Sequence, residues 1–258
     1  MNFLKSFLKP LASTTAGIKL RNLANFKPVD SILPGGSFSC SDRFIWRVGC
    51  DFKTLIRFSD LPAIYYGKKD VDVLLVFFDE HGKELYRDTV TPGETVCEYA
   101  VDASRLGVSE GSGTFLLFHL FAEDDAVPVQ ITNRCYVGYS YKENIPSFVH
   151  GNYYAAYIRP GDSETRINND LTFRSLRPSH YWLQKDLSQF DLTELAFVNV
   201  TDKQIWLEVN GRRDTIPAGG LVIREVADSE MAHIRSSMRM PRPIVFSYRQ
   251  GFLDAHHG

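Results

Sequence analysis

Residues 71–90 read VDVLLVFFDEHGKELYRDTV, and this stretch decides the fold class. Its first half is a run of β-branched and aromatic residues, which favour strands. Gly82 suits the tight turn that follows, and residues 84–90 then alternate between two sets of side chains, as a β-strand does. The stretch therefore predicts two strands joined by a turn.

Two short runs in this half are apolar at every position, LLVFF (74–78) and FLLF (115–118). They are too short for typical core helices and suit central strands that are covered on both faces. The second cover has two candidate sources, which are the other half of the chain and another subunit.

Similar strand signals recur at regular spacing from Ser37 to Tyr141 and again after residue 152, with turn-forming residues between them. Asn210-Gly211 fits a two-residue type I′ hairpin loop, because both central positions of that loop need positive φ. We therefore expect an all-β protein with two β-sandwich domains of jelly-roll or immunoglobulin-like type. The expected divisions are an N-terminal segment at residues 1–28, a first sandwich at 29–145 and a second at 146–258.

One segment of the second half favours a helix instead. In DSEMAHIRSSM (228–238), Asp228 or Ser229 could cap a helix, with Met231, Ile234 and Met238 along one side.

The first residues, MNFLKSFLKPLAST, place apolar side chains at helical spacing. Lys5 and Lys9 interrupt the run, which makes it a poor signal-peptide core. We expect a short basic amphipathic helix that lies on a membrane surface through residues 1–12, or that docks on this protein or on a partner subunit. No run of about 18 apolar residues indicates a helix that spans a membrane.

The composition is that of a globular protein, with 44% apolar and 23% charged residues among 258. Net charge is −2 and no basic stripe is present, so nucleic acid is not an expected partner. Cys40, Cys50, Cys97 and Cys135 form no C-x-x-C pair, and buried free thiols in a reducing compartment are expected. The prediction is a cytoplasmic protein, either free or peripheral to the inner membrane. A Cys40–Cys50 disulfide is the alternative if the protein is exported.

Sequence motifs do not fix a reaction. G-x-S-x-G, a P-loop, G-x-G-x-x-G and H-E-x-x-H are all absent, and no cofactor is predicted. Four histidines of the second half could supply zinc ligands if they converged, although nothing in their spacing shows convergence. They are His150, His180, His256 and His257. Ordinary surface histidines and a polar ligand site without metal are the other two interpretations.

Aromatic residues crowd the same region, in GNYYAAY (151–157) and HYWLQ (180–184). Aromatic rings beside polar side chains form flat amphipathic surfaces, which suit sugar rings. Tyrosines that fill the edge of a sandwich are the alternative interpretation.

The last residues, GFLDAHHG, are expected to be ordered and to pack beside HGN (150–152). RPIVFSY (242–248) reads as a strand, and a free tail would leave Phe252 and Leu253 exposed. His257 would then meet His150 and Asn152, with Arg242 near the start of the strand.

Four motifs carry a resemblance, which are SDRFIWR (41–47), CYVGYSY (135–141), FVHGN (148–152) and RPIVFSY…FLDAHHG (242–258). They resemble a family of bacterial proteins of two β-rich halves that is associated with surface-polysaccharide gene clusters. The resemblance implies a glycan context and no mechanism. The family-like residues are His150, Gly151, Asn152, Arg242, Pro243, His257 and Gly258, whereas His256 stands where an aromatic residue is expected.

These observations together predict a non-catalytic carbohydrate-binding or assembly protein of bacterial surface-polysaccharide biosynthesis. The alternatives are a glycan-modifying enzyme of the same pathway, either a metal-assisted hydrolase or a transferase, and a structural homo-oligomer. The residues expected to bind a glycan or sugar ligand are His150, Asn152, Tyr153, His180, Trp182, Arg242 and His257.

Overall fold

A computed structural model describes residues 37–69, 71–121, 135–151, 156–158, 166–167, 174–184, 187–200, 204–226, 231–238 and 242–258. Within these ranges the protein is all-β, as expected, with one short α-helix, α3 (Leu61–Tyr66), and one 3-10 turn, η2 (Leu187–Gln189). None of the described helices is long and apolar enough to cross a membrane. The predicted N-terminal segment, residues 1–28, lies outside the described residues.

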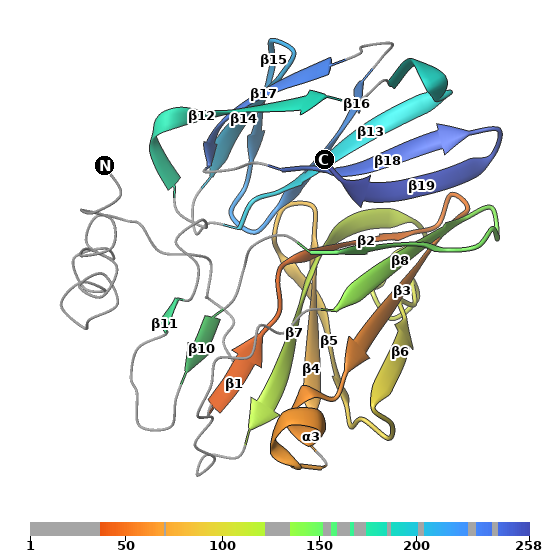
Figure 1. Cartoon of the computed structure of the whole chain (residues 1–258), viewed down its shortest axis with the longest axis vertical. Helices are drawn as coiled ribbons and strands as arrows, with labels where there is room; N and C mark the ends of the chain where they lie inside the picture. Colours follow the sequence, from red (N-terminus) through yellow and green to blue (C-terminus); the bar gives the residue numbers. More distant parts are fainter. Residues whose placement is uncertain are drawn as a thin grey trace.

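The strands form four antiparallel sheets (Figure 1). Sheet I has the order β11 (Arg166–Ile167), β10 (Ala156–Ile158), β1 (Ser37–Cys40), β7 (Gly111–Phe121), β4 (Val73–Asp79) and β5 (Glu84–Val90), with β2 (Phe44–Val48) also paired to β7. Sheet II has the order β6 (Val96–Ala100), β3 (Phe52–Ser59), β8 (Tyr136–Tyr141) and β9 (Ser147–His150). Sheet III has the order β16 (Leu221–Val226), β13 (Leu192–Val198), β18 (Ile244–Arg249) and β19 (Phe252–His257). Sheet IV has the order β12 (Arg174–Gln184), β17 (Met231–Met238), β14 (Ile205–Val209) and β15 (Arg212–Ile216).

The expectation of two β-sandwich domains is wrong. The four small sheets are arranged as a four-bladed β-propeller. Two hydrophobic clusters fill the space between the sheets, and each cluster contains residues from both halves of the chain. The core is therefore shared between the halves instead of being divided into two separate sandwich interiors.

Strand β4 shows how one strand serves both clusters. Successive side chains of a strand point to opposite faces of its sheet. Leu74, Val76 and Phe78 belong to the first cluster. Val73, Leu75 and Phe77 belong to the second cluster. The prediction that the apolar run 74–78 is a central strand covered on both faces is confirmed.

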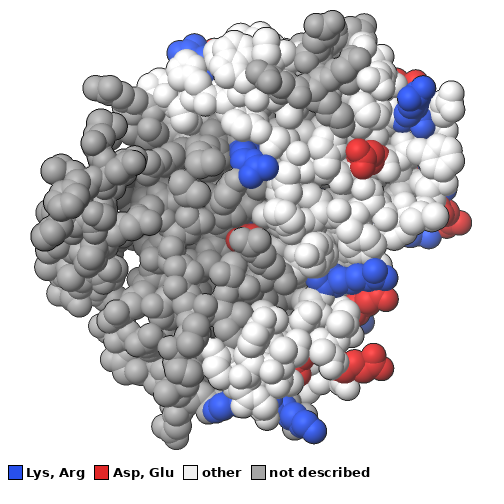
Figure 2. Space-filling view, in the orientation of Figure 1, with Lys and Arg blue, Asp and Glu red and all other residues white. Residues whose placement is uncertain are grey.

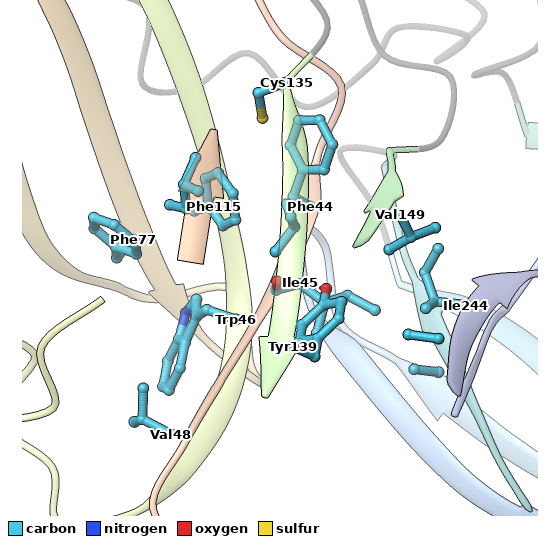
Figure 3. Close-up of a cluster of buried hydrophobic side chains, with 14 of the residues drawn as sticks. Phe44, Ile45, Trp46, Val48, Phe77, Phe115, Cys135, Tyr139, Val149 and Ile244 are labelled. Atoms are coloured by element: carbon cyan, nitrogen blue, oxygen red, sulfur yellow. Dashed lines mark hydrogen bonds between the residues drawn. The ribbon is translucent and has the colours of Figure 1, made fainter. Parts of the chain in front are cut away.

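Sheet III contributes residues to both hydrophobic clusters. Leu195 joins the first cluster, whereas its neighbour Ala196 joins the second. Ile244 also belongs to the second cluster, which Figure 3 shows with Ile244 near Val149. The second cover of sheet I therefore comes from the other half of the chain, which was one of the two predicted sources.

Buried polar contacts also join the two halves. The Arg47 guanidinium lies 2.6 Å from Glu194 Oε2 and donates to the Tyr248 hydroxyl at 3.1 Å. Arg43 is buried and donates to Thr114 Oγ1 at 2.8 Å and to the Gly219 carbonyl at 2.9 Å. Because a buried cation is costly unless it is paired and hydrogen-bonded, these contacts fix how the halves meet.

Strand β9 follows the predicted division between residues 145 and 146 and pairs with β8, which precedes it. The two halves therefore contribute neighbouring strands to sheet II at this point.

The segment expected to be helical is instead strand β17, so that prediction is wrong. Ala232, Ile234, Ser236 and Met238 alternate with more exposed residues, and all four are buried. A period of two fits this alternation of buried and more exposed residues, and the helical spacing of three apolar side chains was coincidental. The predicted hairpin loop is confirmed, since Asn210 and Gly211 have φ of 48° and 83° between β14 and β15.

The expectation of buried free thiols holds for Cys135, whereas Cys50 is exposed and Cys97 is half-buried. Cys50, Cys97 and Cys135 are free thiols, so Cys50 forms no disulfide with Cys40. The charged side chains visible in Figure 2 are scattered over the described surface, with Lys and Arg often beside Asp and Glu. Charge alone therefore marks no site on that face.

Candidate functional site

The residues predicted to bind ligand separate into two places. His150, Arg242 and His257 gather where β9 meets β19, which we call the β9–β19 joint. His180 and Trp182 lie on β12, on the outer face of sheet IV. Asn152 and Tyr153 lie outside the described residues.

At the β9–β19 joint, His257 Nε2 lies 3.0 Å from His150 Nδ1. The two ring centroids are 4.2 Å apart. Arg242 Nε donates to the backbone oxygen of Gly258 at 3.0 Å, and Gly258 N donates to the Pro243 carbonyl at 3.0 Å. The prediction that the last residues pack beside HGN is confirmed at His150, whereas Asn152 lies outside the described residues.

One reason given for that prediction does not hold. Phe252 is 63% exposed, so its burial does not hold the segment down. Leu253 packs against the second cluster and Ala255 is buried in it. The segment is also held by the backbone pairing of β19 with β18, which runs from Ile244↔His257 to Arg249↔Phe252.

His256 and His257 are neighbours on a strand, and their side chains therefore point to opposite faces. His256 Nδ1 lies 3.2 Å from Asp254 Oδ2, whereas His257 faces His150. The alternative metal set of His150, His180, His256 and His257 is thus divided between separate contacts. In the part of the chain that the structure describes, no three His, Cys, Asp or Glu side chains are placed to hold a metal ion.

Burial lowers the pKa of His257 to about 4, with further lowering from His150 and Arg242. His257 is therefore neutral at pH 7. Its Nδ1 is buried and has no hydrogen-bond partner among the described residues. A neutral imidazole has one N–H, so the hydrogen bond between the two histidines runs in whichever direction the tautomers allow.

The outer face of sheet IV carries a second histidine pair and an exposed tryptophan. Trp182 and His233 are directly opposite each other in the β12–β17 register. Their rings stack at a centroid distance of 3.8 Å and an interplanar angle of 10°. His180 Nδ1 lies 3.1 Å from His233 Nε2. Trp182 remains 50% exposed, so the stack presents aromatic surface to solvent.

Strand alternation explains why Trp182 points outward. Its neighbour Leu183 is buried in the first cluster, which leaves the opposite face for Trp182. Strand β12 is at the edge of sheet IV, and β17 with its His233 lies on its paired side. The stack therefore stands at the rim of the sheet.

Sequence reasoning missed His233, because its segment was expected to be helical. The signal that would have found it is the alternation of Ala232 and Ile234 with His233 and Arg235. As a strand, this pattern places His233 and Arg235 on the same outer face.

The same face continues across β14 and β15. Arg235 lies 2.8 Å from Glu208 Oε1, and these two residues are opposite each other in the register. The Arg213 guanidinium stacks over the Trp206 ring at 4.2 Å. Flat rings, imidazole nitrogens and guanidinium groups together suit a ligand with apolar faces and hydrogen-bonding edges.

The chain matches no protein-family model and no curated protein sequence. Among solved structures, an α-L-rhamnosidase of Streptomyces avermitilis in complex with L-rhamnose aligns over 88% of this chain and 26% of its own. The identity is 10% and the TM-score is 0.24. The chain thus spans about a quarter of the length of that enzyme, and a likeness of this degree carries no argument about function.

Proposed function

We propose that the protein is a non-catalytic carbohydrate-binding protein and that a sugar ring binds on the outer face of sheet IV. The observation that carries the proposal is the half-exposed Trp182 held parallel to His233. A sugar presents a C–H face that stacks on an aromatic ring and hydroxyls that need hydrogen-bond partners at its edge. His180 and Arg235 lie beside the stack and supply such partners.

Preorganisation supports binding at this place. The backbone of Trp182 is fixed by β12–β17 pairing, and His233 covers one face of its ring. A side chain that is already held in position loses little conformational entropy when a ligand arrives. The stacked rings of Trp182 and His233 therefore need no rearrangement to accept a flat ligand.

The placement of carboxylates on this face favours sugar binding over glycoside hydrolysis. Glycoside hydrolysis generally uses two carboxyl groups that flank the scissile bond. Among the described residues of this face, Glu208 is the carboxylate nearest the stack, and Arg235 holds it in an ion pair. The motif resemblance to proteins of surface-polysaccharide gene clusters supports a role in assembly of such glycans.

A glycan array of bacterial surface polysaccharides, followed by calorimetry on the glycans that bind, tests the proposal. Trp182→Ala should lower affinity at least tenfold while its melting temperature stays within about 2 °C of wild type. Phe252→Ala is the matched control, since Phe252 is an exposed aromatic on sheet III. Absence of glycan binding by the wild type, or equal affinity of Trp182→Ala, overturns the proposal. A stable oligomer that Trp182→Ala dissociates would instead favour the structural alternative.

A further inference from the structure

We infer that the outer face of sheet IV selects glycans that contain uronic acids, in which a sugar bears a carboxylate. This inference rests on the proposed sugar-binding function and names the class of sugar. It comes from the charges that the sheet register places around the two tryptophans.

The charged side chains of the face do not balance. Among the side chains of this face that the structure describes, Arg235 and Arg213 carry two positive charges and Glu208 carries one negative charge, which leaves a net charge of +1. The whole chain has a net charge of −2. This face is therefore locally positive on a protein that is negative as a whole, and it is complementary to an anionic ligand.

Arg213 is the group that would meet the anion. Glu208 is opposite Arg213 in the β14–β15 register, but its ion pair is with Arg235 at 2.8 Å. Among the described residues, Arg213 forms no ion pair, and its guanidinium carbon lies over the Trp206 ring, 4.2 Å from the ring centroid. A guanidinium stacked in this way keeps its N–H edge available, and that edge matches a carboxylate in a bidentate pair.

The spacing of the two tryptophans suits an extended chain. Trp182 is opposite His233, whereas the backbone N–H of Trp206 donates to Ser237 Oγ, four residues farther along β17 than His233. Four residues of strand and two strand spacings separate the rings by roughly 16 Å. One sugar ring on Trp182 and a carboxylate-bearing sugar beside Arg213 and Trp206 would therefore belong to one oligosaccharide.

The size of the charge favours a carboxylate over a phosphate ester. A carboxylate carries one negative charge, which the net charge of +1 neutralises. A phosphate monoester carries about −1.5 to −2 at pH 7, and it would leave an uncompensated charge at this face.

The test uses the full chain with two matched probes, an oligogalacturonate hexamer and the neutral hexamer obtained by reducing its carboxyl groups, alongside an oligomannuronate pair prepared in the same way. The wild type should bind at least one acidic hexamer about tenfold tighter than its reduced counterpart at 50 mM salt. Arg213→Gln should bring the two affinities of that pair to within about twofold.

Arg212→Gln is the matched control. Arg212 is adjacent to Arg213 in sequence, so its side chain points to the other face of the sheet. It is opposite the buried Val209 in the β14–β15 register. It should keep the preference of the wild type. Equal affinity of the wild type for acidic and neutral hexamers overturns the uronic-acid inference and leaves the proposed sugar binding standing. If the wild type binds neither the acidic nor the neutral hexamer of either pair, the uronic-acid inference is overturned. If it also binds no glycan on the polysaccharide array, the proposed function itself is overturned.

Discussion

The protein holds two histidine pairs with almost the same contact distance in very different surroundings. His150 and His257 meet at 3.0 Å where two sheets join, and His180 and His233 meet at 3.1 Å on an open sheet face. At the joint, each histidine comes from a different sheet, and burial lowers the pKa of His257 to about 4. On the face, both histidines belong to paired strands of sheet IV, and a tryptophan extends the pair into a stack.

The comparison teaches that a short contact between imidazoles does not define a function. The β9–β19 joint links elements that are distant in sequence, so its histidines are expected to contribute to stability. The outer face is already ordered by its sheet, so its rings are free to contact a ligand. The predictions that follow separate these two roles.

The largest expected effect is on the pH dependence of unfolding. Burial lowers the pKa of both His119 and His257 to about 4, against an ordinary value of 6.5. As the pH falls, these histidines are protonated in the unfolded chain at a higher pH than in the folded protein. Their contribution to the free energy of unfolding is therefore fully present above pH 6.5 and is lost as the pH drops towards 4. A shift of about 2.5 units (6.5 minus 4) corresponds to about 3 kcal/mol for His119, and to on the order of 1 kcal/mol for the more exposed His257.

Urea unfolding at pH 7, 5.5 and 4 measures this loss. His257→Gln should remove the smaller part of the slope and His119→Gln the larger part. A His257→Gln variant that keeps the full pH dependence of the wild type would show that the joint does not hold a neutral histidine.

The second effect is the coupling between the two histidines of the joint. His257→Ala should lower the free energy of unfolding by about 1 kcal/mol at pH 7, because it removes one net hydrogen bond. A double-mutant cycle with His150→Ala should give a coupling energy of about 0.5–1 kcal/mol. Additive losses, measured by urea unfolding, would mean that the 3.0 Å contact contributes nothing to stability.

The smallest effect is expected on the outer face. His180→Ala should change the free energy of unfolding by no more than about 0.5 kcal/mol, as surface substitutions usually do. The same variant should weaken binding of any glycan that depends on Trp182, since His180 contacts His233, which stacks on Trp182. A loss of stability as large as that of His257→Ala would erase the distinction between the two pairs.

Local structure was predictable where one residue pattern has one physical solution. The Asn210-Gly211 loop needs positive φ at both positions, and few residue pairs meet that need. Residues 74–78 are apolar on both sides of the strand, which requires two covers. The contact between His257 and His150 followed from reading residues 242–248 as a strand.

The arrangement of the sheets was not predictable, because the two faces of β4 are chemically alike. Both faces carry only apolar side chains, so the sequence does not indicate which sheet covers each face. One face has Leu74, Val76 and Phe78, and the other has Val73, Leu75 and Phe77. The same limit applies to the candidate site. His180 and Trp182 were predicted to bind ligand in one set with the histidines of the joint, whereas they lie on another sheet. Their partner His233 was missed because the apolar residues of its segment fit a helix as well as a strand.

The shared core has a consequence for synthesis on the ribosome. Phe118 belongs to the same cluster as Val245, and 127 residues separate them in the chain. At 5–20 residues per second, about 6–25 s pass between the emergence of the two strands. During that interval the apolar row of β4 and β7 lacks its cover from β13 and β18, and it resembles the exposed surface that chaperones bind. A nascent chain of this protein is therefore expected to depend on chaperones until the last strands have been made, and a pause in translation before residue 192 should increase aggregation.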